Sequence, residues 1–426
     1  MEEMKRQQRK RADDIARKMS PHLRKALSAE SRRKAGGSGG GRTMRILLEV
    51  DRRPSRGWVE SLKRGFASRG YRFQVLRRMP RLRLVSAIVS IPCLRTLCRH
   101  RRVTRVHLDR KVRVRLNVAT PSVGASALQS RGSTGKGVAI AIIDTGVYPH
   151  PDLTKPVNRI AAFRDFVGGR TKPYDDNGHG THVAGDAAGN GFSSKGKYRG
   201  PASGAKLVVA KAFDRNGEGN SSDIVAAIDW VLRVRKKYGI RVVNMSFGLP
   251  GVSRCSDDPI CRAAERAWRS GLVVVASAGN DGPGPRTVTS PGISPLLLTV
   301  GAVDDRRTVR QADDRVAAFS GRGPIAGGRT KPDLTAPGVG IVSLRAPGSA
   351  IDRDDPSARV GARYFKLTGT SMAAPIVAGG AAQLLQKRPR LSPAGVKRLL
   401  KRGAFRLKAP RNAQGSGELD LRFAVK

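Results

Sequence analysis

Three short segments of the chain carry side chains that could cooperate in nucleophilic catalysis. Residues 369–375 (GTSMAAP) place Ser371 at the first turn of an expected helix that runs to about Gln386. A helix N-terminus leaves backbone N–H groups without intrahelical partners, so this position can combine a nucleophilic hydroxyl with a donor for an oxyanion. A lone serine here is more often a helix cap, and the prediction therefore depends on the other two segments.

The other two segments supply a carboxylate and a histidine. Residues 142–146 (IIDTG) end an expected strand at Asp144, and residues 177–185 (NGHGTHVAG) begin an expected helix at His179. A serine hydroxyl is a poor nucleophile until a base takes its proton, and the imidazole needs a carboxylate to orient one ring nitrogen. Each segment alone is weak evidence, but together they predict a catalytic triad of Asp144, His179 and Ser371.

An α/β scaffold is expected to position these residues. Near-continuous Val, Ile and Ala runs suit parallel strands that are covered on both faces, and such sheets carry their sites at the carboxyl ends of the strands. The predicted fold class is therefore α/β, with a doubly wound, mostly parallel sheet. The expected strands are Val138–Ile143, Leu207–Ala212, Val242–Ser246, Leu272–Ser277 and Leu297–Val300.

The N-terminal part of the chain is predicted to be separate. Residues 1–42 are strongly basic and end in a glycine-rich run, which predicts a flexible tail. Residues 43–115 show the order strand, helix, strand, strand, helix, strand, which predicts a small ferredoxin-like α/β domain. The larger domain then spans residues 116–426.

The net charge of the 426-residue chain is +48, from 81 Lys and Arg against 33 Asp and Glu. A positive charge of this size predicts non-specific, salt-sensitive binding of polyanions. An alternative function is therefore that of a nucleic-acid-associated protein that uses the basic tail. The basic residues are scattered through all expected elements, however, which favours a general bias in composition. The chain has no run of 18 apolar residues and no apolar secretory signal, so we expect a cytoplasmic protein without membrane contact.

Four cysteines are too few and too local to predict a disulfide framework. Cys255 and Cys261 could bridge a loop if they were oxidised. The sequence does not favour a zinc site at this pair or at Cys93 and Cys98.

The three segments together resemble the active-site signatures of the subtilisin-like serine proteases, the subtilases of peptidase family S8, and the resemblance covers about residues 127–425. Residues 173–177 (PYDDN), 185–186 (GD) and 343–345 (SLR) are similar to the intracellular AprX-type branch. The resemblance implies that Ser371 is the nucleophile, that His179 is the general base and that Asp144 orients it. His182 is then expected to be structural.

The resemblance also implies an oxyanion donor and a substrate cleft. Residues 277–280 (SAGN) match the family's oxyanion strand, so the Asn280 amide is expected to stabilise the oxyanion. The peptide substrate is expected to lie as an added strand, with broad selectivity for apolar or medium-sized residues before the scissile bond. The expected cleft residues are Ser246, Phe247, Gly248, Ser277, Ala278 and Gly279, with Thr289 in the primary pocket and with Asp175, Asp176 and Asp281 adding tolerance for basic residues.

Residues 43–115 match the position of the family's propeptide, which implies an intramolecular inhibitor and self-cleavage between Val112 and Thr120. The chemistry requires no cofactor, although Asp152 matches a family calcium position and implies a possible structural calcium. A second alternative is a catalytically silent subtilase that acts as a binding module. The intact Asp144, His179, Asn280 and Ser371 argue against it.

Overall fold

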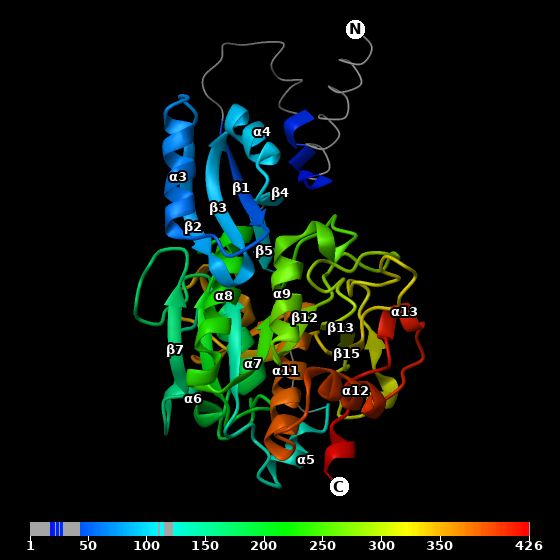
Figure 1. Ribbon diagram of the computed structural model, residues 1–426. Coiled ribbons are helices and arrows are strands. Elements are labelled where there is room, and N and C mark those ends of the chain that lie inside the picture. The colour runs from blue at the N-terminus through cyan, green and yellow to red at the C-terminus, as the bar shows by residue number, and fades with distance from the viewer. Residues whose placement is uncertain are drawn as a thin grey trace. The chain divides into compact units, whose positions relative to one another are not determined.

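The computed structural model describes residues 18–21, 23, 24, 26–28, 43–109, 111–114 and 122–425, and over 111–114 the backbone alone. The chain divides into two units, the first ending at Arg110 and the second beginning at Lys111 (Figure 1). The second unit thus begins four residues before the end of the predicted N-terminal domain. Within the described ranges, no helix has both the length and the apolar character needed to cross a membrane.

The first unit contains a four-stranded antiparallel sheet with the order β2-β3-β1-β4. Helices α3 and α4 bury Phe66 and Leu97 in the same apolar core as the sheet. The elements, in chain order, are β1 (Thr43–Val50), α3 (Arg56–Ala67), β2 (Phe73–Met79), β3 (Leu84–Ser90), α4 (Ile91–Arg99) and β4 (Val103–Leu108).

Part of the segment predicted to be a flexible tail packs into this unit. Met19 forms a parallel bridge with Val106, and the Ser20 N–H donates to the Val106 carbonyl at 2.9 Å. Met19 and Leu23 are buried in the core of the first unit. Apolar side chains therefore tie down the middle of the segment, while residues 1–17 and 29–42 lie outside the described residues.

The second unit is built on the predicted, mostly parallel sheet. Its strand order is β14-β13-β12-β10-β6-β8-β7, and β15 also pairs with β13. All of these pairs are parallel except that of β13 with β14. The strands are β6 (Ala139–Asp144), β7 (Ile160–Asp165), β8 (Lys206–Lys211), β10 (Ile240–Met245), β12 (Val273–Ser277), β13 (Leu298–Asp304), β14 (Arg315–Val316) and β15 (Leu334–Pro337).

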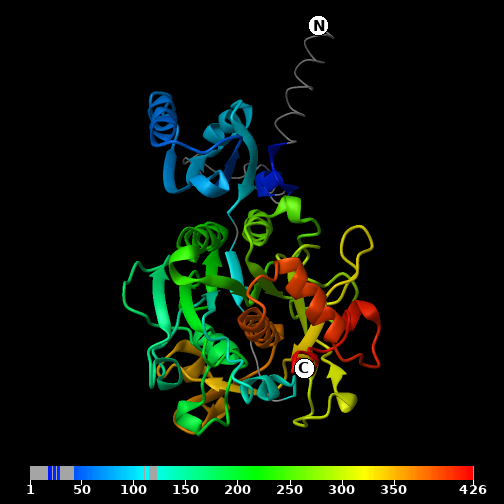
Figure 2. The ribbon, with the colours of Figure 1, turned by 60° about the horizontal axis from the view of Figure 1, so that its bottom comes forward.

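Helices cover both faces of this sheet (Figure 2). Helices α8 (Ser221–Tyr238) and α9 (Pro259–Arg269) pack together on one face, while α7 (His179–Ala188) and α11 (Thr370–Lys387) pack together on the other. Helix α12 (Pro393–Gly403) contacts α11 and β12. The direction of winding reverses between β6 and β10, and an α/β sheet commonly binds its ligand at the carboxyl edge of such a switch point.

Two small antiparallel sheets complete the second unit. One has the order β11-β5-β9 and the other β16-β18-β17. Their strands are β5 (Lys111–Val114), β9 (Glu218–Asn220), β11 (Phe247–Gly248), β16 (Ile341–Leu344), β17 (Arg359–Val360) and β18 (Tyr364–Leu367), and the short helices are α5 (Ala125–Gln129), α6 (Pro151–Thr154), α10 (Ala350–Asp354) and α13 (Arg411–Gln414).

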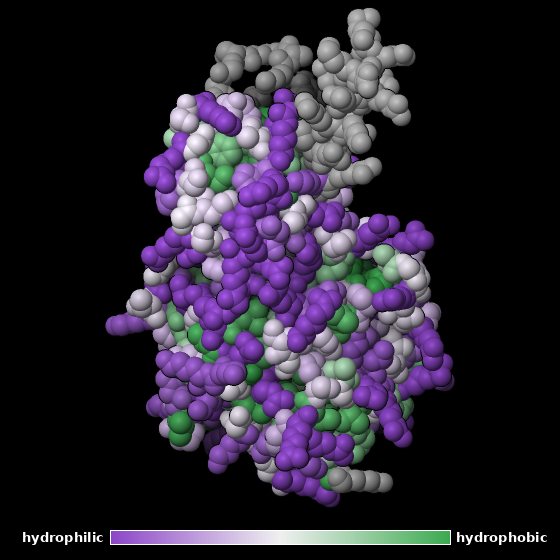
Figure 3. All heavy atoms as spheres, in the orientation of Figure 1, coloured by the Kyte–Doolittle hydropathy of each residue, from purple (hydrophilic) through white to green (hydrophobic). Residues whose placement is uncertain are grey.

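The surface is mainly hydrophilic, as the view in Figure 3 shows. Among the described residues, the large apolar side chains that are exposed are Val157, Val167, Phe192 and Val309. These four are scattered along the chain, and isolated apolar side chains are normal for a soluble surface.

Near the C-terminus, two buried carboxyl groups share one environment. Glu418 is fully buried, and its backbone pairs with Phe405 in both directions at 2.7 and 2.8 Å. Burial raises the pKa of Glu418 to about 10, and the nearby negative charge of Asp314 contributes to this rise. Burial also raises the pKa of Asp314. The folded chain therefore retains a proton here that the unfolded chain releases.

This retained proton predicts a stability that depends on pH. The contribution is complete below the unfolded-state pKa of about 4.5 and is lost as the pH rises toward the raised folded-state value. In a Ser371→Ala background, which prevents autolysis, Glu418→Gln should reduce the fall in unfolding free energy between pH 6 and 9 by up to about 1.4 kcal/mol per pH unit. Urea unfolding at several pH values measures this slope. The exposed Asp354→Asn serves as the control, and equal slopes for Glu418→Gln and the control would contradict the prediction.

Candidate active site

Asp144 and His179 meet where β6 ends and α7 begins. The Nδ1 atom of His179 lies 2.6 Å from Oδ1 of Asp144, and both side chains are fully buried. The Thr145 N–H also donates to Oδ1, at 2.8 Å. Because a carboxylate only accepts hydrogen bonds, Nδ1 is the protonated nitrogen of the neutral ring, and Nε2 is the nitrogen with the basic lone pair.

A close approach between backbones brings the two residues together. A Cβ atom at Gly180 would lie 2.2 Å from the carbonyl oxygen of Gly146, so the first turn of α7 rests directly on the turn after β6. The Gly180 N–H donates to the Thr145 hydroxyl at 2.8 Å, and that hydroxyl donates to Asp175 at 2.9 Å. Asp175 also accepts from the backbone and the hydroxyl of Thr181. Asp175 is buried and supports the helix start from within, so its carboxylate is not exposed to add the tolerance for basic residues that we predicted.

Ser371 is the second residue of α11 and lies at the same edge of the sheet. Its hydroxyl donates to the Ser246 carbonyl at 3.0 Å, and the Ser246 hydroxyl donates to the Ser371 carbonyl at 2.6 Å. Asn244, near the end of β10, donates to that Ser246 hydroxyl at 2.8 Å. Ser246 follows β10, which pairs with β6 in parallel, so Ser371 and Asp144 lie at the same edge of the sheet. Helix α7, which begins at His179, also packs against α11.

Asn280 is oriented as a donor. Its side-chain oxygen accepts hydrogen bonds from both the N–H and the hydroxyl of Thr370, each at 2.9 Å. Because these contacts use the amide oxygen, the NH₂ group is the part left to donate. This donor is anchored to the residue that precedes Ser371, as the oxyanion prediction requires.

A strand of the same chain lies in the expected substrate cleft. In strand β5, Arg113 pairs with Gly248, and Val114 pairs with Phe247, in an antiparallel register. Strand β9 covers the other edge of β5, with Gly219 opposite Val112. We predicted residues 277–279 as cleft residues, but Ser277 ends β12 and the next two residues follow it. Strand β9 is the flank of β5 that sequence reasoning missed.

Thr289 fills the space between two glycines of the predicted cleft. A Cβ atom at Gly248 would lie 2.1 Å from the Thr289 hydroxyl oxygen, and one at Gly279 would lie 2.6 Å from it. The Thr289 N–H donates to the Ala278 carbonyl at 3.0 Å. Thr289 is buried, and its hydroxyl has no hydrogen-bond partner among the described side chains. A cavity of about 660 Å³ is lined by Thr289, by Asp281 and by the segments 250–253 and 324–328.

The remaining polar residues of this region have structural partners. His182 contacts Asp186 through Nδ1 at 2.9 Å and the Phe365 carbonyl through Nε2 at 3.2 Å. Both ring nitrogens are therefore used, as expected for a structural histidine. Asp176 pairs with the buried Lys211 at 2.6 Å.

The predicted calcium ligand does not fit a cation. Asp152 is fully buried; its Oδ1 accepts from the Ser193 N–H and its Oδ2 from the Tyr364 hydroxyl, both at 2.8 Å. The guanidinium of Arg159 donates hydrogen bonds to the nearby carbonyl oxygens of Asp152, Ala188 and Ala205, at 2.5, 2.7 and 3.1 Å. Arg159 is buried, and burial lowers its pKa to about 10. An arginine thus supplies the positive charge to the oxygens that a cation would need.

The parallel sheet and the meeting of aspartate, histidine and serine in that chain order define a class of hydrolytic serine enzymes. Residues 135–420 match the sequence profile described as "Subtilase family". The chain belongs to this family of serine proteases, whose members need no cofactor for catalysis.

Two relatives and one solved structure illustrate the similarity. Serine protease AprX of Bacillus subtilis is 45% identical over 331 residues, which are 76% of this chain and 74% of that protein. Subtilisin Savinase of Lederbergia lenta is 35% identical over 304 residues, or 71% of this chain and 96% of that one. Fervidolysin of Fervidobacterium pennivorans, a keratinolytic enzyme related to subtilisin, shares the fold with a TM-score of 0.71 at 24% identity, over 92% of this chain and 62% of its own.

The contacts of Arg159 predict a stability that does not depend on calcium at this loop. Arg159→Met should lower the unfolding free energy by about 2–4 kcal/mol, because three carbonyl groups each lose a donor. The exposed Lys155→Met is the control and should change little. Thermal unfolding with calcium and with a chelator, in a Ser371→Ala background, should give equal Tm values. A calcium-dependent Tm that disappears in Asp152→Asn would contradict this account.

Proposed function

We propose that the chain is a serine endopeptidase that forms an acyl-enzyme on Ser371. The proposal rests on one observation above all, the buried 2.6 Å contact between His179 and Asp144 at the sheet edge that also holds Ser371. The Ser371 oxygen attacks the peptide carbonyl carbon while Nε2 of His179 takes its proton. His179 then gives that proton to the leaving amine, and Asp144 stabilises the imidazolium. A water molecule activated by His179 releases the acyl group in a second cycle.

In this mechanism the oxyanion accepts hydrogen bonds from two donors. One is the Asn280 NH₂ group, whose orientation Thr370 sets through the amide oxygen. The other is the Ser371 N–H at the start of α11, where the helix dipole also favours negative charge. Both donors are held by contacts made before the substrate binds, so little reorganisation is needed in the transition state.

Turnover of a denatured protein tests this function. Ser371→Ala should lower kcat by about 10⁶ and Asn280→Ala by about 10²–10³, magnitudes that are those of subtilisin itself. Thr330→Gly, an exposed change outside the site, should leave turnover unchanged. A catalytically silent binding module would instead show no turnover in the unmodified chain.

We further propose that residues 43–115 are a ferredoxin-like propeptide that inhibits the enzyme through β5. The strand order of the first unit and the pairing of β5 with β11 and β9 support this. Phe247 is the partner of Val114, and Ser246 directly precedes Phe247. The Ser246 carbonyl accepts a hydrogen bond from the Ser371 hydroxyl. The register thus favours self-cleavage after the residue that follows Val114. Residues 115–121, which hold most of the predicted cleavage segment, lie outside the described residues.

Self-cleavage predicts a defined new N-terminus. The purified chain should be cut between Arg115 and Leu116, whereas Ser371→Ala should remain full length, because the cut needs the chain's own nucleophile. N-terminal sequencing and intact mass measure both. A Ser371→Ala chain cut at the same bond would contradict self-cleavage.

We propose a broad specificity in which Thr289 favours small and medium-sized residues before the scissile bond of free substrates, whereas the cut after Arg115 is intramolecular and does not require this fit. The Thr289 side chain occupies the slot between Gly248 and Gly279, where a longer substrate side chain would otherwise extend. A side chain in this position limits how far a substrate residue extends into the pocket, and it does not select for charge.

Removing the Thr289 side chain should allow larger residues before the scissile bond. Thr289→Gly should raise kcat/KM by about tenfold for peptides with Phe before the scissile bond and leave Ala peptides within about twofold. Peptides that differ only at this residue give the measurement. An unchanged ratio of Phe to Ala would show that Thr289 is not the floor of the pocket.

We also infer weak, salt-sensitive binding of polyanions and a cytoplasmic location. The net charge of +48 and the hydrophilic surface support the first inference. The second rests on sequence alone. Retention on a polyanion matrix should weaken as the salt concentration rises. If it persists without residues 1–42, the net charge of the whole chain causes it; if it is lost, the basic tail does.

A further inference from the structure

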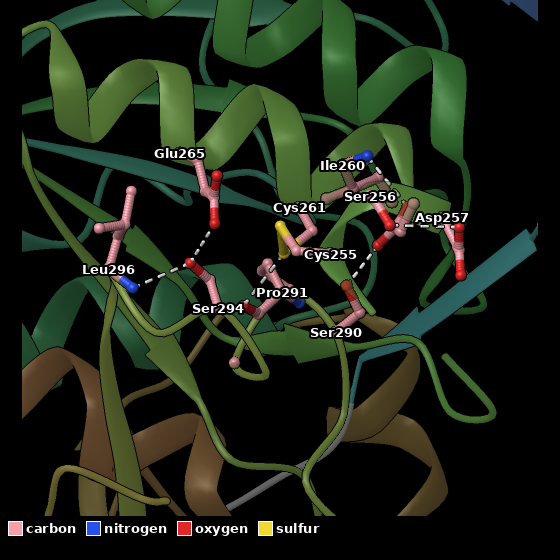
Figure 4. Close-up of a disulfide and its surroundings, with 12 residues drawn as sticks. Cys255, Ser256, Asp257, Ile260, Cys261, Glu265, Ser290, Pro291, Ser294 and Leu296 are labelled. Carbon is pink, nitrogen blue, oxygen red and sulfur yellow. Dashed lines mark hydrogen bonds between the residues drawn. A yellow bond between two sulfur atoms is a disulfide. The ribbon is translucent and has the colours of Figure 1, made fainter. Parts of the chain in front are cut away.

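Cys255 and Cys261, whose pairing the sequence left open, are joined by a disulfide (Figure 4). Cys255 begins the 3₁₀ turn η4 (Cys255–Asp257), and Cys261 lies fully buried in the first turn of α9. The bond therefore ties the turn that precedes α9 to the helix itself.

The residues enclosed by this disulfide contact the segment that follows Thr289. Asp258 caps α9 by accepting the Ile260 N–H through Oδ1 at 3.0 Å, and its Oδ2 accepts the Ser290 hydroxyl. The sulfur of Cys261 lies 3.7 Å from the Pro291 carbonyl oxygen. Figure 4 shows Ile260, Ser290 and Pro291 close to the disulfide.

Ser290 in turn connects the two sides of the primary pocket. Its backbone exchanges hydrogen bonds with Leu249 at 2.8 and 3.1 Å. Leu249 directly follows Gly248, and Thr289 directly precedes Ser290. The hydrogen bonds between Leu249 and Ser290 therefore connect the segment of Gly248 to the segment of Thr289. The loop that leads from Leu249 to Cys255 includes residues 250–253, which line the 660 Å³ cavity beside Thr289.

We propose that the Cys255–Cys261 disulfide is a positioning element for the primary pocket and that its reduction by a dithiol weakens binding of substrates that use the depth of this pocket. The inference rests on the proposed protease function. With the bond intact, the 249–258 loop is closed at both ends, and Asp258 holds Ser290 in place. Without it, the loop samples more conformations, and Ser290 and Thr289 lose a constraint.

The redox step needs a dithiol as the reductant. One thiolate attacks the half-buried Cys255 sulfur and forms a mixed disulfide, and the Cys261 sulfur leaves as a thiolate that takes up a proton. The second thiol of the reductant then displaces Cys255. Two electrons pass to the protein, which ends with two thiols, while the reductant ends as a cyclic disulfide.

The effect should appear in KM rather than in kcat. Asp144, His179 and Ser371 lie on β6, α7 and α11, none of which contains a residue of the 249–261 segment. Loosening this segment alters the pocket that binds substrate and leaves the contacts among the reacting groups in place. When KM changes and kcat does not, the substrate and the transition state have lost the same amount of binding energy.

The experiment compares oxidised enzyme, dithiol-treated enzyme and Cys255→Ser/Cys261→Ser on peptides with Leu or Ala before the scissile bond. For the Leu peptide, both treatments should raise KM about three- to tenfold with kcat within about twofold, and the Ala peptide should change less. The double variant should not respond further to dithiol. Cys93→Ser/Cys98→Ser keeps only the pair of interest and should respond as the unmodified chain does.

Two results would overturn the inference. One is a KM for the Leu peptide that is the same in all redox states, which would mean that Asp258 and the α9 cap hold the pocket unaided. The other is an equal loss of kcat for both peptides together with a lowered Tm, which would make the disulfide a general stabiliser. Failure of the proposed function is distinguishable, because oxidised enzyme would then hydrolyse neither peptide.

Discussion

The contact between His179 and Asp144 is the interaction on which the site depends. At 2.6 Å and fully buried, it sets the tautomer of the imidazole and holds the ring where β6 ends. The contact exists because Gly180 lets the start of α7 rest on the turn after β6 without an intervening side chain. A larger residue at Gly180 would push the helix, and the histidine with it, away from the carboxylate.

The rest of the site follows from the ends of neighbouring elements. Ser246, which follows β10, exchanges hydrogen bonds with Ser371 at the start of α11, so the proposed nucleophile is tied to the sheet beside β6. The next residues form β11, the edge on which β5 lies. One short segment therefore links the nucleophile to the binding of an extended peptide, and β5 shows how such a peptide can be held between two strands by its backbone.

The parts of the site that depend on local sequence could be predicted from it. Asp144, His179 and Ser371 each stand at a strand end or a helix start that their neighbours specify, and long apolar runs were enough to indicate a parallel sheet. The burial of Met19 and Leu23 could not be predicted, because it depends on a surface formed by residues far along the chain. Nor could the role of β9, since Gly219 faces β5 only through tertiary packing.

The contacts of Arg159 illustrate the same limit. The three carbonyl groups that it contacts come from separate segments, so no local motif marks the arrangement. The disulfide is a related case. A spacing of six residues makes the bond between Cys255 and Cys261 possible, but only the turn and helix geometry brings the two sulfur atoms together.

The most direct test of the account is peptide mapping after reaction with a serine-directed organophosphorus reagent. The account predicts one adduct, on Ser371, in the self-cleaved chain, and almost none in His179→Ala, because the hydroxyl then lacks its base. An adduct on another serine, or equal labelling of Ser371 without His179, would contradict the claim that the buried aspartate and histidine activate this nucleophile.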